Sequence, residues 1–393
     1  MTIGFSARAT RSTCVLCVAG LLALMPVAAA ARPARPDPGG PGGPRATEPQ
    51  PSALYRSGTQ VRPRPGAPGI PRVSALSWVV ADAGSGAVLA AHDAHRRLPP
   101  ASTLKTLFAL TVLPVLPGGI RHRVGTEELT GIGPGSSLVG VAEGNTYRVS
   151  DLWNGVFLHS GNDAVRVLAG LTGGWSATAA RMQAEARKLG ARDTRVLSPD
   201  GYDAPGQVSS AYDLAVFGRA GLRNADFARY CARIEAVFPG GGGEPYGIRN
   251  TNRLLTGEDG VEPYPGLIGI KNGYTSSAGN TLVAAARRDG RTLVVTVMNP
   301  QEGGGLAVYE EARALLDWGF GAAGRVDPVG SLAPRPARPR PRPGPQPVTV
   351  KAARPGLREP GWPESGAILG AAGLGAGAVA LALRLKFGRV EQV

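Results

Sequence analysis

Residues 99–106, Pro-Pro-Ala-Ser-Thr-Leu-Lys-Thr, place a serine and a lysine three positions apart where an apolar segment begins. Leucine and phenylalanine recur with helical spacing up to residue 110, and Pro114 ends the pattern. The spacing predicts a helix that begins near Ser102 and carries Lys105 one turn later on the same face. A serine becomes nucleophilic only beside a base, and burial near a helix N-terminus would suit Lys105 to that role. An N-cap serine followed by a surface lysine gives the same local pattern.

A second motif, Ser160-Gly161-Asn162, interrupts another helical pattern. Apolar residues recur with helical period over 150–158 and again over 165–171. The triplet is therefore predicted to form a loop between two helices. There, the Ser160 hydroxyl could pass a proton between Lys105 and a leaving group, and the Asn162 carboxamide could orient Lys105 and the substrate. Ordinary turn and capping residues would look the same.

The third motif, Lys271-Asn272-Gly273, lies in a predicted strand at 267–274. A lysine at a strand edge could supply a fixed positive charge for a substrate carboxylate, and Gly273 would let the backbone approach the substrate closely. A lysine that protects a sheet edge from aggregation has the same pattern. The other predicted elements are strands at 75–81 and 87–91, a hairpin of 280–285 with 291–297, and a helix at 306–320 that covers the sheet.

In this order and at these spacings, the three motifs resemble the active-site signature of penicillin-binding proteins and serine β-lactamases. The resemblance covers most of residues 75–325 and looks like the D-alanyl-D-alanine carboxypeptidase family of low-molecular-mass penicillin-binding proteins. It implies an α/β penicillin-binding-protein fold: an antiparallel sheet flanked by helices, an all-helical lobe, and a cleft between them. The stretches that carry it further are residues 100–106, 135–137, 160–164, 209–214 and 250–255.

The same resemblance implies a role for each motif residue. Ser102 would be the acylated nucleophile and Lys105 its general base, while Ser160 and Asn162 would form the proton relay and substrate contact. Lys271 would bind the terminal carboxylate, and the backbone amides of Ser102 and Tyr274 would form the oxyanion hole. The expected substrate-binding residues are Lys271, Asn272, Gly273 and Tyr274.

Two positions depart from the family pattern. Asn272 stands where the family commonly has threonine, so the contact with the substrate carboxylate is expected to change its geometry. His159 precedes the second motif, where proline or another apolar residue is expected.

The implied function is a serine-type D-Ala-D-Ala carboxypeptidase that trims peptidoglycan stem peptides, is acylated by β-lactams and needs no metal or cofactor. A serine β-lactamase is the first alternative, although residues 162–271 lack the Glu-x-x-Leu-Asn pattern of class A enzymes. A catalytically inactive wall-binding protein is the second, with Asn272 as its only sequence support. A zinc peptidase is excluded because the four histidines lack an H-E-x-x-H spacing.

The composition of the N-terminal part indicates export. Residues 1–31 have a basic start, a short apolar run and a small-residue exit, which is typical of a signal peptide. Residues 32–72 are rich in Pro, Gly and Arg and are predicted to be a disordered linker. Two of the three cysteines fall in the signal peptide, so Cys231 alone remains and no internal disulfide is expected.

The C-terminal part predicts a membrane anchor. A catalytic domain at 73–325 is followed by a second linker, 326–365, with repeated Pro-Arg pairs. Residues 366–383 carry no charge and are long enough for one transmembrane helix, and the basic tail 384–393 favours a cytoplasmic end. We therefore expect an exported enzyme anchored to the outer face of the bacterial cytoplasmic membrane. The net charge of +14 fits anionic wall polymers or lipid headgroups, and no nucleic-acid partner is expected.

Overall fold

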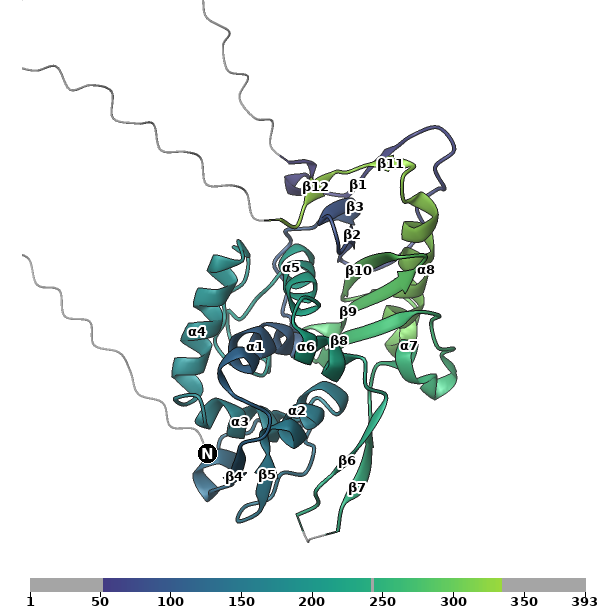
Figure 1. Cartoon of the computed structure of the whole chain (residues 1–393). Helices are drawn as coiled ribbons and strands as arrows, with labels where there is room; N and C mark the ends of the chain where they lie inside the picture. Colours follow the sequence, from purple (N-terminus) through teal and green to yellow (C-terminus); the bar gives the residue numbers. More distant parts are fainter. Residues whose placement is uncertain (1–51, 242–243, 334–393) are drawn as a thin grey trace, which may run out of the picture. The chain divides into compact units, whose positions relative to one another are not determined.

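An antiparallel sheet forms the centre of the fold (Figure 1). The computed structural model describes residues 52–241 and 244–333. Within them, the sheet order is β11 (Val326–Asp327), β1 (Thr59–Pro63), β3 (Ala87–His92), β2 (Ser77–Asp82), β10 (Arg291–Met298), β9 (Gly279–Arg288) and β8 (Leu267–Thr275), with β12 (Gly330–Ser331) beside β3. The strand β8, which carries the third motif, is thus an edge strand.

Helices cover both faces of the sheet (Figure 1). On one face lies α8 (Ala307–Ala322), with the short α7 (Arg253–Thr256) near β8. On the other lie α1 (Lys105–Val112), α2 (Val149–Leu158), α3 (Asn162–Gly170), α4 (Trp175–Lys188), α5 (Ala211–Gly221) and α6 (Ala225–Cys231). Two small hairpins accompany these helices: β4 (Arg121–Arg123) with β5 (Thr146–Arg148), and β6 (Glu235–Phe238) with β7 (Tyr246–Arg249).

The central strands β2, β9 and β10 are apolar along almost their whole length because both of their faces are buried. Alternate residues divide between two cores. Val80 and Val295 pack with Trp318 of α8, whereas Val79 and Val294 pack with Phe217 of α5. The expected α/β fold, with a helix-flanked antiparallel sheet and a helical lobe, is confirmed.

The N-terminal linker was predicted to extend to residue 72, and this boundary is wrong. Residues 53–55 form a 3-10 turn in which Leu54 is buried, and β1 pairs with β3 and β11. The indole Nε1 of Trp318 donates a hydrogen bond of 3.1 Å to the carbonyl of Pro68. The Pro- and Arg-rich composition of this segment hid the strand, because the side chains of β1 are exposed or half-buried and Pro63 is its last residue, so no apolar alternation marks it.

The C-terminal domain boundary also moves. The linker was predicted to begin at 326, but β11 and β12 pair with β1 and β3, and Leu332 is buried. The predicted signal peptide (1–31), residues 32–51 of the first linker, residues 334–365 of the second and the predicted membrane helix (366–383) lie outside the described residues. Among residues 52–241 and 244–333, no helix has both the length and the apolar character needed to cross a bilayer.

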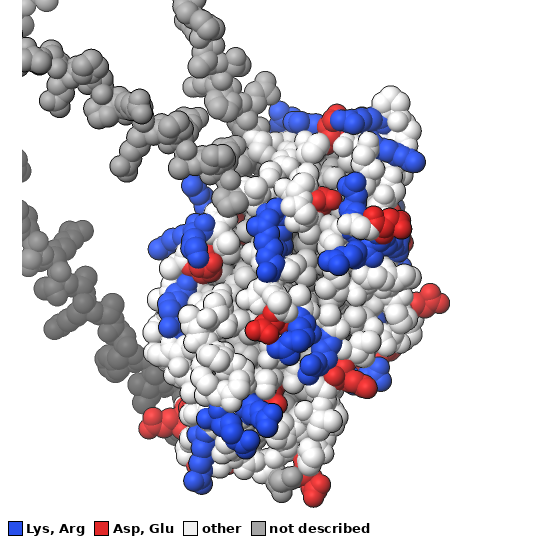
Figure 2. Space-filling view, viewed as in Figure 1, with Lys and Arg blue, Asp and Glu red and all other residues white. Residues whose placement is uncertain are grey.

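Positive charge is spread over the surface of the folded part. Figure 2 shows Lys and Arg side chains in several separate groups on one face, with fewer Asp and Glu side chains among them. The excess of basic residues is therefore not confined to the Pro/Arg-rich segment after residue 333.

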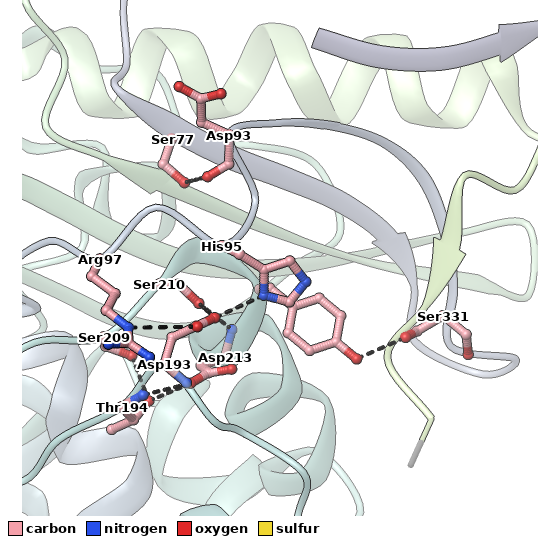
Figure 3. Close-up of polar contacts among 11 residues, drawn as sticks. Ser77, Asp93, His95, Arg97, Asp193, Thr194, Ser209, Ser210, Asp213 and Ser331 are labelled. Carbon is pink, nitrogen blue, oxygen red and sulfur yellow. Dashed lines mark hydrogen bonds and ion pairs between the residues drawn. The ribbon is translucent and has the colours of Figure 1, made fainter. Parts of the chain in front are cut away.

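A largely buried polar cluster joins the segment before the first motif to the start of α5 (Figure 3). The ring Nδ1 of His95 lies 2.7 Å from Oδ2 of Asp193, which also accepts a hydrogen bond from Ser210. The carboxylate of Asp213 accepts from the backbone of Asp193 and from Thr194, and burial raises the pKa of Asp213 to about 6. These contacts hold the connection after β3 against the start of α5, and a bridge between Leu98 and Ser209 leads from there into the first motif.

Candidate active site

The first motif folds as predicted, except that a short 3-10 turn precedes the α-helix. Residues 101–104 form this turn and α1 begins at Lys105. The Nζ of Lys105 lies 2.7 Å from Oγ of Ser102, and it also donates to the backbone carbonyl of Asp200 at 2.9 Å. Lys105 is buried, whereas Ser102 is partly exposed. A lysine that contacts a serine hydroxyl in a half-closed site has the geometry of a base–nucleophile pair.

Burial changes the proton affinity of Lys105. Removal from water disfavours the ammonium form and lowers the pKa of Lys105 to about 8, against the opposing charges of Asp200 and Asp163. An appreciable fraction of Lys105 is then neutral near physiological pH. Burial is the largest cause of this lowered pKa, which agrees with the role of base that the sequence suggested for Lys105.

Two glycines allow other segments to approach Ser102 closely. A Cβ on Gly273 would lie 2.6 Å from the backbone nitrogen of Ser102, so only glycine lets β8 pass there. A Cβ on Gly201 would lie 2.0 Å from the carbonyl oxygen of Ala101, and Gly201 has a φ of +81°. Ala101 itself has a φ of +50° and is buried. Ser102 is thus held between β8 and the loop after Asp200, and Tyr274 follows Gly273 directly.

The second motif forms the loop between α2 and α3, as predicted. Ser160 has a φ of +60° and is buried, and Asn162 begins α3. Among the described residues, neither Oγ of Ser160 nor Oδ1 of Asn162 has a hydrogen-bond partner. Buried polar atoms are nearly always paired, so these two are free to bind a substrate or transfer a proton.

The Asn162 side chain does not contact Lys105 as the sequence analysis expected. Its Nδ2 donates to Oγ of Ser136 at 3.0 Å, while Lys105 contacts Ser102 and Asp200 instead. The backbone carbonyl of Asp200, from a loop 95 residues away, is the second hydrogen-bond partner of Nζ. Substrate contact by Asn162 stays a prediction.

Asp163 supports the second motif, although the sequence analysis gave it no role. Its carboxylate accepts hydrogen bonds of 2.8–3.0 Å from the backbone nitrogens of Val139, Gly140 and Val141. The Asn162 backbone donates to Ser137 at 2.8 Å. Together these bonds fix the 136–141 segment beside the motif. Only the family-like stretch at 135–137 indicated this region in the sequence.

The third motif lies on β8, and its neighbours join it to the second. The backbone of Thr251 donates to the carbonyl of Leu158 at the end of α2, while its Oγ donates to Oδ1 of Asn272 at 3.0 Å. The oxygen of the Asn272 carboxamide thus accepts from Thr251, and its NH2 group is the part that can donate to a substrate. Tyr274 is 67% exposed at the end of the motif, and His159 is exposed at the end of α2.

Lys271 is more deeply buried than is usual for a lysine at a strand edge. Lys271 is 2% exposed and donates only to the carbonyl of Asn272 among the described residues. Burial, and secondarily the charge of Lys105, lower the pKa of Lys271 well below its ordinary value. A bound carboxylate would restore the ammonium form, so the site favours a ligand that brings a negative charge.

Cys231, the one cysteine in the described part of the chain, is buried in α6, and burial raises the pKa of its thiol to about 12. It is therefore a small core residue rather than a nucleophile, as the sequence indicated.

Comparisons with known proteins agree with this arrangement. A family model described as D-alanyl-D-alanine carboxypeptidase, Peptidase S11, matches residues 64–302. The chain is 41% identical over 249 residues to the D-alanyl-D-alanine carboxypeptidase DacB2 of Mycobacterium tuberculosis, a match that covers 63% of this chain and 82% of that protein. It is 34% identical over 260 residues to the D-alanyl-D-alanine carboxypeptidase DacD of Escherichia coli, covering 63% of each. A crystal structure of a D-alanyl-D-alanine carboxypeptidase from Mycobacterium tuberculosis matches with a TM-score of 0.63 and 39% identity, covering 69% of this chain and 100% of that one.

The match thus spans most of the mycobacterial relative and less than two thirds of the Escherichia coli relative. The family model covers more than half of this chain, including all three motifs. The fold, the order of the motifs and the pairing of Ser102 with Lys105 agree with that match. The chain therefore belongs to the D-alanyl-D-alanine carboxypeptidase family of serine peptidases.

Proposed function

We propose that this enzyme removes the terminal D-alanine from peptidoglycan stem peptides through an acyl-enzyme on Ser102. The observation that carries the proposal is the distance of 2.7 Å between Oγ of Ser102 and Nζ of Lys105. Burial lowers the pKa of Lys105 to about 8, so this lysine can accept a proton. In the first step, neutral Lys105 takes the hydroxyl proton while Oγ attacks the carbonyl carbon of the D-Ala–D-Ala bond. The negative charge on the carbonyl oxygen would be stabilised by the backbone amides of Ser102 and Tyr274.

Collapse of this intermediate breaks the peptide bond. The proton held by Lys105 passes, through the hydroxyl of Ser160, to the nitrogen of the departing D-alanine. Water then attacks the ester on Ser102, again with Lys105 as base, and releases the shortened peptide. A β-lactam would acylate Ser102 by the same first step, because its strained amide takes the place of the peptide bond.

Lys271 would select substrates that end in a free carboxylate. Lys271 is buried and, within the described part of the chain, forms no ion pair with an acidic side chain, so its own surroundings lack a negative charge. A substrate carboxylate supplies it and forms charge-assisted hydrogen bonds with Lys271, with the NH2 group of Asn272 as a second donor. An internal peptide bond carries no such carboxylate, which supports action at the chain end.

We expect the substitution Asn272→Thr to change kcat/KM on a D-Ala-D-Ala peptide by less than about tenfold, or roughly 1.4 kcal/mol. Both side chains offer a donor beside Lys271, and the charge of Lys271 contributes most of the carboxylate binding. Steady-state kinetics and the rate of β-lactam acylation measure the effect. If wild type shows neither turnover nor acylation and Asn272→Thr restores both, the protein is an inactive wall-binding protein instead.

The sequence after residue 333 supports export and anchoring by residues 366–383. We expect the full chain to sediment with membranes, and a chain ending at residue 333 to be soluble and equally active. At about 3.1 Å per residue, a polyproline linker of some 30 residues would reach roughly 90 Å from the membrane. Cell fractionation and β-lactam labelling of both forms test this.

A chain ending at residue 324 is the matched control. It lacks β11 and β12 as well as the tail, so we expect a lower Tm than for the chain ending at 333. Equal Tm values for the two chains would show that β11 and β12 do not stabilise the fold. If the chain ending at 333 still sediments with membranes, residues 366–383 are not the membrane anchor.

A further inference from the structure

A pocket of about 380 Å³ opens next to the segment that precedes Ser102. It is lined by the loop of residues 201–208, by Pro99 and Pro100 before the first motif, and by Ser277 after β8. Of the lining side chains, only that of Asp203 is charged at neutral pH. We call it the Asp203 pocket.

The Asp203 pocket is held in place by contacts with the first motif at one end and with the end of β8 at the other. Its loop follows Asp200, whose carbonyl contacts Lys105, and Gly201 packs on Ala101. At the other end, the Asp203 carboxylate accepts hydrogen bonds from Oγ of Thr275 at 2.7 Å and from the backbone nitrogen of Ser277 at 3.2 Å. The carboxylate is therefore fixed at the end of β8.

Three residues of β8 that lie on one face define a sequence of subsites. Side chains alternate along a strand, so Lys271, Gly273 and Thr275 share a face at intervals of about 7 Å. Lys271 is the proposed carboxylate site, Gly273 lies against Ser102, and Thr275 contacts Asp203.

An extended peptide that pairs with this edge strand must follow the same order. With its carboxylate at Lys271 and its reactive carbonyl at Ser102, the acyl D-alanine lies near Gly273. The residue that precedes this D-alanine then lies opposite Thr275, next to the Asp203 pocket. The direction of the substrate is thus set by the two ends of β8.

We propose that the Asp203 pocket binds an ammonium group on the side chain of the residue that precedes the acyl D-alanine. This proposal rests on the proposed function and adds a determinant of its substrate. A carboxylate has about four lone-pair positions, and two hydrogen bonds leave room for a cation. Within the described part of the chain, no lysine or arginine forms an ion pair with Asp203.

The walls of the pocket and the charges of the site fit such a side chain. Pro99, Pro100 and Ala204 offer apolar contacts to the methylene groups of a long amine-bearing side chain. The site then has lysines at the end that receives a carboxylate and an aspartate at the end that receives an ammonium. This complementarity would bind the peptide in one direction only.

The test compares two peptides that differ in one charge, Nα-acetyl-L-Lys-D-Ala-D-Ala and its Nε-acetylated form. We expect full-length enzyme to prefer the free amine about fivefold to tenfold in kcat/KM, and this preference to fall at high salt. In Asp203→Asn the ratio should fall to near one. The asparagine oxygen can still accept from the backbone nitrogen of Ser277, and its NH2 group can donate to Oγ of Thr275. Asp203→Glu should keep the preference.

Two controls separate this proposal from the proposed function. Asp226→Asn removes the same charge from α6, away from the pocket, and should leave the preference unchanged. Binding of both peptides to Ser102→Ala, measured as Kd, should show the same preference without any turnover. No preference in wild type, or an equal preference in Asp203→Asn, would overturn the role of Asp203. A preference in Kd without turnover in wild type would leave the Asp203 pocket intact and contradict the carboxypeptidase activity.

Discussion

We expect Ser102→Ala to abolish both carboxypeptidase activity and covalent labelling by a β-lactam, with a fall in kcat of at least about 10³-fold. Alanine leaves Lys105 and the carboxylate site in place but removes the oxygen that forms the acyl-enzyme. The measurement is peptide hydrolysis together with mass spectrometry of the intact protein after incubation with benzylpenicillin. Wild type should gain the mass of one β-lactam, and peptide mapping should place it on residue 102.

The matched control is Ser85→Ala in the turn between β2 and β3, which should keep full activity and labelling. Because Ser102 is partly exposed and Lys105 keeps its bond to Asp200, Ser102→Ala should also keep the Tm of wild type within a few degrees. An adduct on any other residue, or turnover at the wild-type rate in Ser102→Ala, would refute the assignment of the nucleophile.

The pairing of Ser102 with Lys105 could be predicted from the sequence because it depends on local geometry. Residues three positions apart at a helix start share a face whatever the rest of the chain does. The strands β2, β9 and β10 could be predicted for a similar reason: a buried strand carries an apolar run between turn residues.

The partners that come from distant loops could not be predicted. Asp200 contacts Lys105 through a backbone carbonyl, and no side-chain pattern marks a backbone contact. Ser136 and Thr251 lie in two of the stretches that resemble the family, but their contacts with Asn162 and Asn272 appear only when the fold brings these residues together.

The state of Lys271 depends on tertiary structure as well. Its burial and the approach of Lys105, 166 positions earlier in the chain, lower its pKa. The sequence indicates a lysine at a strand edge, which is normally charged. Similarly, the Arg- and Pro-containing β1 has the composition of a linker, and only its pairing with β3 and β11 makes it a strand.

The second large effect on activity is expected from substitution of Lys105, the proposed general base. We expect Lys105→Arg to lower kcat/KM by at least about 10³-fold, because a guanidinium stays protonated and cannot accept the serine proton. Lys105→Met is the control for folding. It removes a buried charge, so its Tm at pH 7 should equal or exceed that of wild type although it is inactive. Full activity in Lys105→Arg would require a different base.

The same pKa predicts the pH dependence of wild type. With a pKa of about 8, the neutral fraction of Lys105 falls by roughly 50-fold between pH 8 and pH 6, and kcat/KM should fall with it. Asp200 and Asp163 oppose the shift, and the neighbouring Lys271 must be charged to bind the carboxylate. Burial lowers the pKa of Lys271 as well, so this lysine loses its proton at a lower pH than an exposed lysine, and kcat/KM should fall again on the alkaline side as the carboxylate loses this partner.

The two limbs of this bell-shaped profile can be assigned by comparing kcat/KM with kcat. A bound carboxylate raises the pKa of Lys271, so the alkaline limb should move to higher pH in kcat, which reports the enzyme–substrate complex. In Asn272→Thr, which keeps both lysines, the acidic limb should stay where it is in wild type. A profile that is flat between pH 6 and pH 8 would show that proton transfer to Lys105 does not limit acylation, and would contradict its role as the base.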